Sequence, residues 1–451
     1  MQSVKEHYII QYFVFSCICA MAFFKTILGL PIPTNMLSLA AIGLILLCKT
    51  PGTGLVTMIG FQMLDAIIQV ALGSTSVSFL LVAIPLYLLR FGFITREIDV
   101  GCCIKIICLV FLCAIEVYHI SSYSVNGMGT LLIWMISMVF FIFSMSGIST
   151  SINRSYLIAT WATSLIVVML INMGSYNHPV LSQNGYSFSS YNSLYRLGDQ
   201  YRTLGGPNTL CLEAGLLFSF SICEFVRSSV SKVARAFPIC GLAISTIVGF
   251  LTFSRAFIVE VLIVVLIVMV SRKDVHFWAK FSLIAIGAVV LIYVLSTPVF
   301  VDQVSGLVNR FDEGNSNRFT LIERGIELFI SSIPSLLFGN GIIYPMNPDI
   351  NFTSHNIVID SFAAFGLCGV FLWGIIISSA IKYISINRER IILLNLIPLV
   401  ILAANEFIIG SVRDTFVYLY VPLMFFLASQ TEYEELNNDG QKNSLYLVRK
   451  K

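Results

Sequence analysis

The sequence predicts an all-α, polytopic integral membrane protein with about 12 to 14 transmembrane helices and two long outward-facing loops, the larger of which contains an amphipathic helix. Of its 451 residues, 57% are hydrophobic and only 11% are charged. The mean hydropathy is +0.88. A chain of this composition cannot form a set of soluble domains of roughly 100 to 200 residues each. Its net charge of +3 is small, and nothing in it indicates nucleic-acid binding.

Apolar runs follow one another along the chain, and several are shorter than the roughly 20 residues expected of a spanning helix. The first run is interpreted as a retained helix, because no small-x-small cleavage site follows it and further spans come directly after. The candidate helices are Tyr8–Phe24, Met36–Leu47, Gly54–Leu72, Val77–Leu89, Cys102–Ile120, Met128–Met145, Tyr156–Asn172, Thr209–Phe225, Phe237–Phe253, Ala256–Val270, Phe281–Leu295, Ile357–Ile377, Ile391–Ala404 and Phe416–Ser429.

These runs divide the chain into six segments. The expected order is N-terminal transmembrane helices (1–172), a first long outward-facing loop (173–208), central transmembrane helices (209–295), a large outward-facing loop (296–356), C-terminal transmembrane helices (357–429) and a cytoplasmic tail (430–451).

The placement of lysine and arginine predicts the orientation, because short cationic loops are seldom translocated. One set of connections and tails carries nineteen of the 27 lysines and arginines. The other set carries Lys25, Arg196, Arg202, Arg255, Arg310, Arg318, Arg324 and Arg413. Both termini are therefore expected in the cytoplasm, and both long polar loops are expected to face outward.

Seven of the eight outward cations are arginines, which suggests binding of an anionic lipid head group. Arginine offers a planar fork of donors that matches phosphate oxygens, whereas lysine is a point charge. The alternative is that each arginine pairs with a local acid, as Arg324 could with Glu327, or Arg413 with Asp414. Eleven cysteines lie mostly in apolar runs, and the five histidines are scattered. We therefore expect neither disulfides nor a metal site.

The larger loop has an amphipathic pattern from Arg318 to Leu337, which is consistent with a helix lying in the membrane interface. Pro334 and the turn Gly339-Asn340-Gly341 are expected to end it. His355 then lies at the entry to the next helix, where its unperturbed pKa near neutrality suits a general base for a sugar hydroxyl. The alternative role for His355 is a helix cap, as Asn356 could also provide.

Several short motifs occur in a suggestive order. They are Arg202 to Gly206-Pro207-Asn208, Thr252-Phe253-Ser254-Arg255, Asn317-Arg318, Pro334 to Gly339-Asn340-Gly341, and His355-Asn356 to Gly366-Leu367-Cys368-Gly369. In this order the chain resembles the O-antigen polymerase and O-antigen ligase superfamily, over roughly Arg196 to Gly369.

The resemblance implies a glycosyltransferase of the bacterial inner membrane with a periplasmic active site. Its donor would be a glycan on undecaprenyl pyrophosphate, with no metal or cofactor. His355 would activate the acceptor hydroxyl, and Arg202, Arg255 and Arg318 would bind the pyrophosphate. The expected substrate-binding set also includes Arg196, Arg310, Arg324, Asn208 and Asn356. An inverting single displacement is expected, although Glu323, Asp349 and Asp360 leave a carboxylate nucleophile open.

Two outward loops with arginines favour a polymerase over a ligase. This sequence matches the arginine-to-glycine spacing of the polymerases only approximately. A polysaccharide chain-length regulator is a plausible partner, together with membrane lipid. A lipid-linked oligosaccharide flippase is the alternative from another class, because intramembrane acids could line a path. These acids are Asp65, Glu116, Glu213, Glu260 and Glu406.

Overall fold

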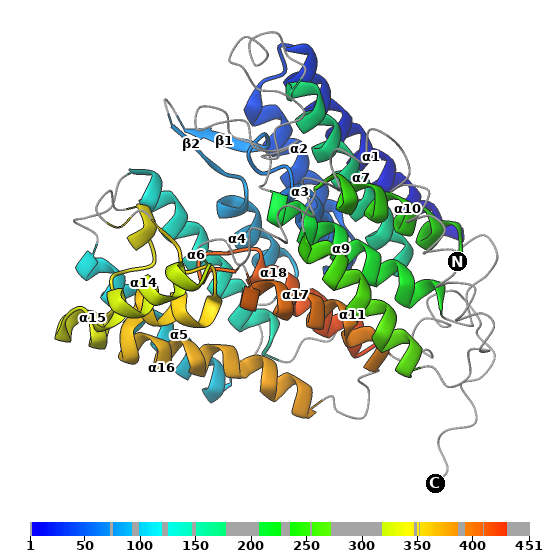
Figure 1. Cartoon of the computed structure of the whole chain (residues 1–451). Helices are drawn as coiled ribbons and strands as arrows, with labels where there is room; N and C mark the ends of the chain where they lie inside the picture. Colours follow the sequence, from blue (N-terminus) through cyan, green and yellow to red (C-terminus); the bar gives the residue numbers. More distant parts are fainter. Residues whose placement is uncertain are drawn as a thin grey trace.

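The computed structural model describes residues 2–72, 75–92, 99–119, 125–146, 150–176, 207–226, 235–252, 255–271, 318–346, 350, 352–386, 393–408 and 410–430. This part of the chain is mostly helical (Figure 1). Five of its helices are long and apolar enough to cross a membrane. The prediction of an all-α, multi-pass membrane protein is therefore confirmed.

The helices follow the apolar runs closely. Of the predicted spans, Phe281–Leu295 lies outside the described residues. The helices are α1 (Gln2–Leu28), α2 (Thr34–Leu47), α3 (Pro51–Gln62), α4 (Leu80–Arg90), α5 (Val100–His119), α6 (Val125–Ser144), α7 (Arg154–Tyr176), α9 (Pro207–Phe225), α10 (Ala236–Leu251), α11 (Arg255–Ser271), α14 (Arg318–Ile330), α15 (Ile333–Phe338), α16 (Ile357–Ile386), α17 (Ile397–Ile408) and α18 (Val417–Ala428), with 3-10 turns η2 (Tyr344–Met346) and η3 (Leu393–Leu396).

A small hairpin replaces the end of one predicted helix and the start of the next. The span Gly54–Leu72 was expected to be helical throughout, but α3 ends at Gln62 and strand β1 (Gln69–Leu72) follows. It pairs antiparallel with β2 (Thr75–Ser78). Asp65 lies between the helix and the hairpin, and its carboxylate accepts hydrogen bonds from the Ser78 hydroxyl at 2.7 Å and the Phe79 amide at 3.2 Å. These bonds fold the chain back, so the two predicted spans are both shorter than expected.

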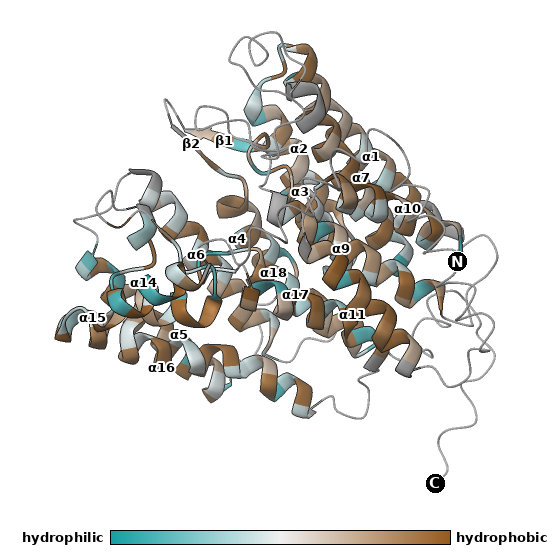
Figure 2. Ribbon diagram, in the orientation of Figure 1, coloured by the Kyte–Doolittle hydropathy of each residue, from teal (hydrophilic) through white to brown (hydrophobic). Residues whose placement is uncertain are grey.

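The helices share one core of large aromatic side chains. Trp161 packs against Tyr420 with ring centroids 5.1 Å apart, and Trp134 packs against Phe365 at 5.5 Å. Other apolar side chains point outward, as does Phe371, which is 70% exposed. Hydrophobic residues cover most helices, whereas hydrophilic ones are frequent on α14 (Figure 2). Outward apolar faces are what a bilayer solvates, which agrees with membrane-spanning helices.

The helix ends gather into two groups at opposite ends of the bundle. At the His355 end, α16 begins where α17 finishes, since the Asn356 side chain donates to the Phe407 carbonyl at 2.8 Å. At the Arg154 end, α7 begins where α9 and α18 finish, since Arg154 contacts both Glu224 and the Leu427 carbonyl. The His355 end contains most of the predicted site residues.

The amphipathic segment of the large loop forms two helices rather than one. α14 lies against α16 (Figure 1), where Gly325 leaves no space for a side chain, because a Cβ there would lie 2.8 Å from Ile359. Phe329 and Phe362 stack with ring centroids 5.3 Å apart. Pro334 does not end the helix as expected. It stands in the first turn of α15, where a missing N–H costs nothing, and the Ser332 hydroxyl caps that helix.

Candidate functional site

His355 lies in the turn that leads into α16 and has an unusual backbone conformation. Its φ is +51°, and it is the non-glycine residue with a positive φ among those that the structure describes. This conformation costs an ordinary residue about 1 to 2 kcal/mol, so surrounding contacts must hold it. The side chain is partly buried, and its Nε2 lies 3.3 Å from the Thr353 hydroxyl. The imidazole ring is therefore held in a defined position just before the N-terminal end of α16.

Asn356, and not His355, caps the helix. Its side-chain oxygen accepts from the amides of Val358 and Ile359, both at 3.1 Å, which satisfies two donors of the first turn. Its side-chain nitrogen is bound to the Phe407 carbonyl. The capping role that the sequence left open for His355 is therefore filled by Asn356. Both ends of the Asn356 amide are engaged within the protein, and its contact with substrate stays a prediction.

The glycine-rich turn docks into a kink of α16. Gly366 has a φ of +63°, and the kink it makes leaves nearby carbonyl groups of the helix without helical partners. Asn340 and Gly341 fill this gap by donating their amides to the carbonyls of Ala363 and Ala364, each at 2.9 Å. A Cβ on Gly339 would lie 2.1 Å from the Ala364 carbonyl oxygen. The turn therefore needs glycine both for its φ of +72° and for this close approach.

A buried carboxylate joins three segments behind His355. Asp360, the fourth residue of α16, is fully buried. One of its oxygens accepts a short hydrogen bond from the Tyr344 hydroxyl, and the other accepts from the Ser411 hydroxyl at 2.6 Å and the Val412 amide at 3.1 Å. These bonds tie η2 and the loop between α17 and α18 to the start of α16. A carboxylate so enclosed is not accessible to a substrate in this conformation, which argues against a nucleophilic role for Asp360.

The loop between α17 and α18 carries two more charged groups. Asp414 accepts a hydrogen bond from the Ser411 amide at 2.7 Å. Burial raises the pKa of Asp414 to about 6, and the Ser411 amide and the positive charge of Arg413 oppose this rise. Burial, together with the neighbouring Asp360, raises the pKa of Tyr344 well above its usual range. Tyr344 therefore stays neutral near pH 7 and acts as a donor to Asp360.

The predicted arginines and Asn208 are placed only in part. Arg255 is the first residue of α11, Arg318 the first of α14 and Asn208 the second of α9. The side chains of these three lie outside the described residues, as do Arg196, Arg202 and Arg310 altogether.

The starts of α9 and α11 belong to the His355 end. Glu260, on the second turn of α11, accepts from the Asn405 side chain at 2.9 Å, near the end of α17. Cys211, on the second turn of α9, has its sulfur 3.9 Å from the same carboxylate. The backbone of Arg255 and the start of the helix that contains Asn208 are therefore close to the end of α17 that Asn356 contacts. The packing of α14 against α16 brings Arg318 to this end as well.

Two arginines do not form the local ion pairs that the sequence allowed for them. Arg324 is exposed, and its guanidinium lies over the Phe352 ring, 4.4 Å from the centroid, rather than against Glu327. Arg413 donates its Nε to the Ser411 hydroxyl at 3.2 Å. Among the described residues no ion pair joins Arg324 to Glu327 or Arg413 to Asp414. The local ion-pair interpretation is therefore wrong for both residues.

Four of the five intramembrane acids, Asp65, Glu116, Glu213 and Glu260, accept hydrogen bonds from neighbouring side chains or backbone, whereas neither carboxylate oxygen of Glu406 has a hydrogen-bond partner among the described residues. Glu213 accepts a short hydrogen bond from the Tyr420 hydroxyl, and Glu116 accepts from the Ile342 amide at 3.0 Å. The eleven cysteines are free. Within the described part of the chain, no three histidine, cysteine or acidic side chains are grouped as a metal site would need.

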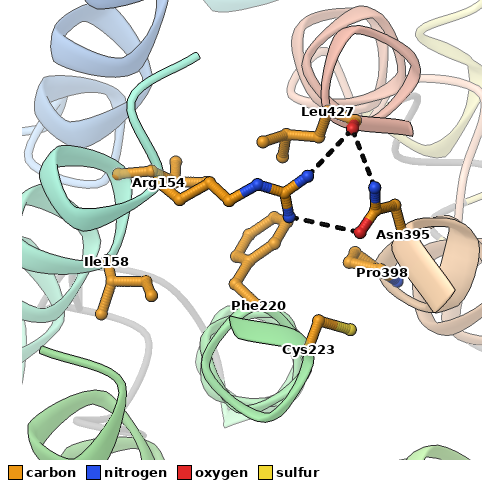
Figure 3. A pocket seen from close by; sticks show the side chains of 8 residues that line it. Arg154, Ile158, Phe220, Cys223, Asn395, Pro398 and Leu427 are labelled. Atoms are coloured by element: carbon orange, nitrogen blue, oxygen red, sulfur yellow. Dashed lines mark hydrogen bonds between the residues drawn. The ribbon is translucent and has the colours of Figure 1, made fainter. Parts of the chain in front are cut away.

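A small pocket lies at the Arg154 end, away from His355 (Figure 3). The Arg154 guanidinium enters it and donates to the Asn395 side chain at 3.3 Å and to the Leu427 carbonyl at 3.2 Å. The remaining wall is mostly apolar. The lining residues are Arg154, Leu157, Ile158, Phe220, Cys223, Asn395, Pro398 and Leu427. We interpret this cluster as a structural joint between helix ends.

Residues 240–374 match the model of the O-antigen ligase family. This match confirms, for that segment, the resemblance to the O-antigen polymerase and ligase superfamily. It runs from α10 into α16 and includes Arg255, Arg318, Arg324 and His355. Arg202 and the loop that contains Ser411 and Arg413 lie outside it. No curated protein matches the chain.

Sequence reasoning missed Tyr344, Ser411 and Arg413 as neighbours of the site. Ser411 lies 51 residues from the Asp360 that it contacts, and single serines and tyrosines carry no local pattern. Arg413 was noted among the outward arginines but was not placed in the site.

Proposed function

We propose that this chain polymerises lipid-linked O-antigen repeat units at the periplasmic face of the bacterial inner membrane. The family match supports O-antigen polymerase or ligase-type activity in general. One observation carries the proposal furthest: the matched residues 240–374 include the starts of α11, α14 and α16 and the turn at Gly339, which lie at the His355 end. The growing glycan would pass from undecaprenyl pyrophosphate to a new repeat unit.

The reaction would be a single displacement that inverts the anomeric carbon. The acceptor hydroxyl attacks that carbon, the bond to the diphosphate oxygen breaks, and His355 takes the hydroxyl proton. Arg255 and Arg318, with Arg202, would hold the diphosphate and stabilise the charge that develops on it as it leaves. The positive φ of His355 supports this role, because it fixes the imidazole at the mouth of α16 before substrate arrives.

A ligase is the second candidate, and the match to the O-antigen ligase family favours it. Polymerase and ligase would share the donor and differ in the acceptor, which is another lipid-linked repeat unit for the first and lipid A-core for the second. Two outward loops rich in arginine favour the polymerase, because one loop could hold the growing chain and the other the incoming unit.

The test is to delete the gene in its host and to separate the extracted lipopolysaccharide on a gel. Core carrying a single repeat unit would support the polymerase, because ligation survives while polymerisation is lost. Bare core with long polymer still on the lipid carrier would support the ligase. Bare core without outward lipid-linked sugar would support a flippase and contradict both.

A further inference from the structure

Arg413 lies at the His355 end in a position that neither the family match nor the predicted site includes. It belongs to the loop between α17 and α18, which begins beyond the matched residues 240–374. Its amide and its Nε both donate to the Ser411 hydroxyl, at 3.3 and 3.2 Å. That hydroxyl in turn donates to Asp360 at 2.6 Å. The stem of Arg413 is thus fixed to a fully buried anchor on α16.

The far side of the guanidinium is not used by these contacts. Neither Nη group of Arg413 has a hydrogen-bond or ion-pair partner among the residues that the structure describes, and the side chain is only partly buried. The two nearby acids do not need these groups. Asp360 already accepts from Tyr344, Ser411 and Val412, and Asp414 accepts from the Ser411 amide.

An arginine held at Nε with both Nη groups open is suited to bind a planar or tetrahedral anion. Two parallel N–H donors match two oxygens of one phosphate group, and such charge-assisted bonds are about twice as strong as neutral ones. The same helix end contains the starts of α11 and α14, where Arg255 and Arg318 stand. Arg413 would add a donor pair from a further segment at this end, the loop between α17 and α18.

We propose that Arg413 is a further anion-binding residue of this site and contributes its two Nη groups to the diphosphate of the lipid-linked donor. This inference rests on the proposed function, since it takes the diphosphate as the ligand. Ser411 and Asp360 are positioning residues, because they hold Arg413 without touching the substrate.

The test measures binding by the purified chain in lipid nanodiscs. Inorganic pyrophosphate and undecaprenyl pyrophosphate are titrated separately against the wild type, Arg413→Gln, Arg413→Lys and Arg90→Gln. Arg90 is the matched control, an exposed arginine that contacts the Leu46 carbonyl and the Phe91 ring. We expect Arg413→Gln to weaken binding about tenfold or more, Arg413→Lys to weaken it less, and Arg90→Gln to bind as the wild type does.

Ser411→Ala separates positioning from direct binding. It leaves the guanidinium in the chain but removes its anchor, so we expect weaker binding than in the wild type and stronger binding than in Arg413→Gln. A wild type that binds neither diphosphate would overturn this inference and the proposed function together. Equal binding by the wild type, Arg413→Gln and Arg413→Lys would overturn the role of Arg413 alone. Weakened binding of the lipid form only would support the role and identify the lipid-linked diphosphate as the ligand.

Discussion

Arg154 and Arg413 lie at opposite ends of the bundle and show two uses of one residue type. The Arg154 guanidinium donates to the Asn395 side chain and to the Leu427 carbonyl (Figure 3). Its Nε lies 3.8 Å from Glu224, and the side chain is only 9% exposed. Arg413 is held by one serine and leaves both Nη groups without a partner among the described residues. The Arg154 guanidinium therefore stabilises the fold, whereas the Arg413 guanidinium is positioned by the fold with two donor groups directed to no described residue.

The backbones of the two ends differ in the same sense. At the His355 end, His355, Gly339 and Gly366 all have positive φ, and a turn docks into a kinked helix. At the Arg154 end, where Gly52 of α3 lies against Ser151, the positive φ among the described residues belongs to Gly92 just after α4, and no described non-glycine residue there adopts it. Strained backbone is kept where surrounding contacts over-determine it, which is typical of functional sites. The difference suggests that changes at the two ends should separate activity from stability.

His355→Ala should give the largest effect, a loss of polymer formation by about 10²- to 10⁴-fold, because a general base contributes on that scale. The protein level and thermal stability should stay normal, and positive φ at this position is no easier for alanine. The measurement is the lipopolysaccharide gel pattern of a complemented deletion strain. His7→Ala, which loses only a contact to Gln11 in α1, is the control. Near-normal polymer in the His355 variant would remove it from catalysis.

Arg154→Met should instead destabilise the protein, by about 3 kcal/mol or more, because it removes a buried positive charge 3.8 Å from Glu224 together with the hydrogen bonds to Asn395 and to the Leu427 carbonyl. Activity per folded molecule should be unchanged. The measurement is the thermal midpoint in detergent, alongside activity normalised to folded protein. Adding Glu224→Gln should recover part of the loss, since a buried negative charge is then removed as well. A variant with normal stability and low activity would reverse the roles assigned to the two ends.

Arg255→Lys and Arg318→Lys should each lose most activity, by about tenfold or more, although the positive charge is kept. Lysine cannot offer two parallel donors to a diphosphate, whereas arginine can. The gel assay measures this loss, and Arg235→Lys, on the exposed start of α10, serves as the control. Full activity of both lysine variants would count against bidentate binding of the diphosphate.

The comparison also explains what the sequence could predict. Hydropathy located the membrane helices, and local patterns located the amphipathic loop, the turn at Gly339 and the helix entry at His355. The hairpin after α3 was missed because the bonds from Asp65 to Ser78 and Phe79, which fold the run back, are not visible in hydropathy.

The contacts that complete the site depend on residues distant in sequence. The hydrogen bonds that Asp360 accepts from Tyr344 and Ser411 join three segments of the chain. No periodic pattern in the sequence predicts these bonds. The kink at Gly366 could be seen only as a glycine inside an apolar run, whose φ of +63° is set by the turn that docks there. The sequence therefore located the turn at Gly339 and the helix entry at His355, while the tertiary structure determined which polar residues hold them in place.

The smallest effect we expect concerns pH and Asp414. Burial raises its pKa in the folded protein to about 6, from an ordinary value of 3.8. The folded state therefore binds this proton more tightly than the unfolded state does. This group's contribution to stability falls as the pH rises from about 4 to about 6, and is constant above that. A tight ion pair with Arg413 would give the opposite sign, because it would lower the pKa of Asp414.

The measurement is the thermal midpoint of the wild type and of Asp414→Asn at several pH values between 4 and 8. The variant should gain on the wild type by a few degrees, about 2 to 4 °C, as the pH rises through the window, and the difference should then level off. Asp99→Asn is the control, because Lys382 and the Cys102 amide lower the pKa of that exposed carboxyl. A variant that instead loses stability relative to the wild type as the pH rises would mean that Asp414 forms a tight ion pair with Arg413, whose Nη groups would then be occupied as those of Arg154 are.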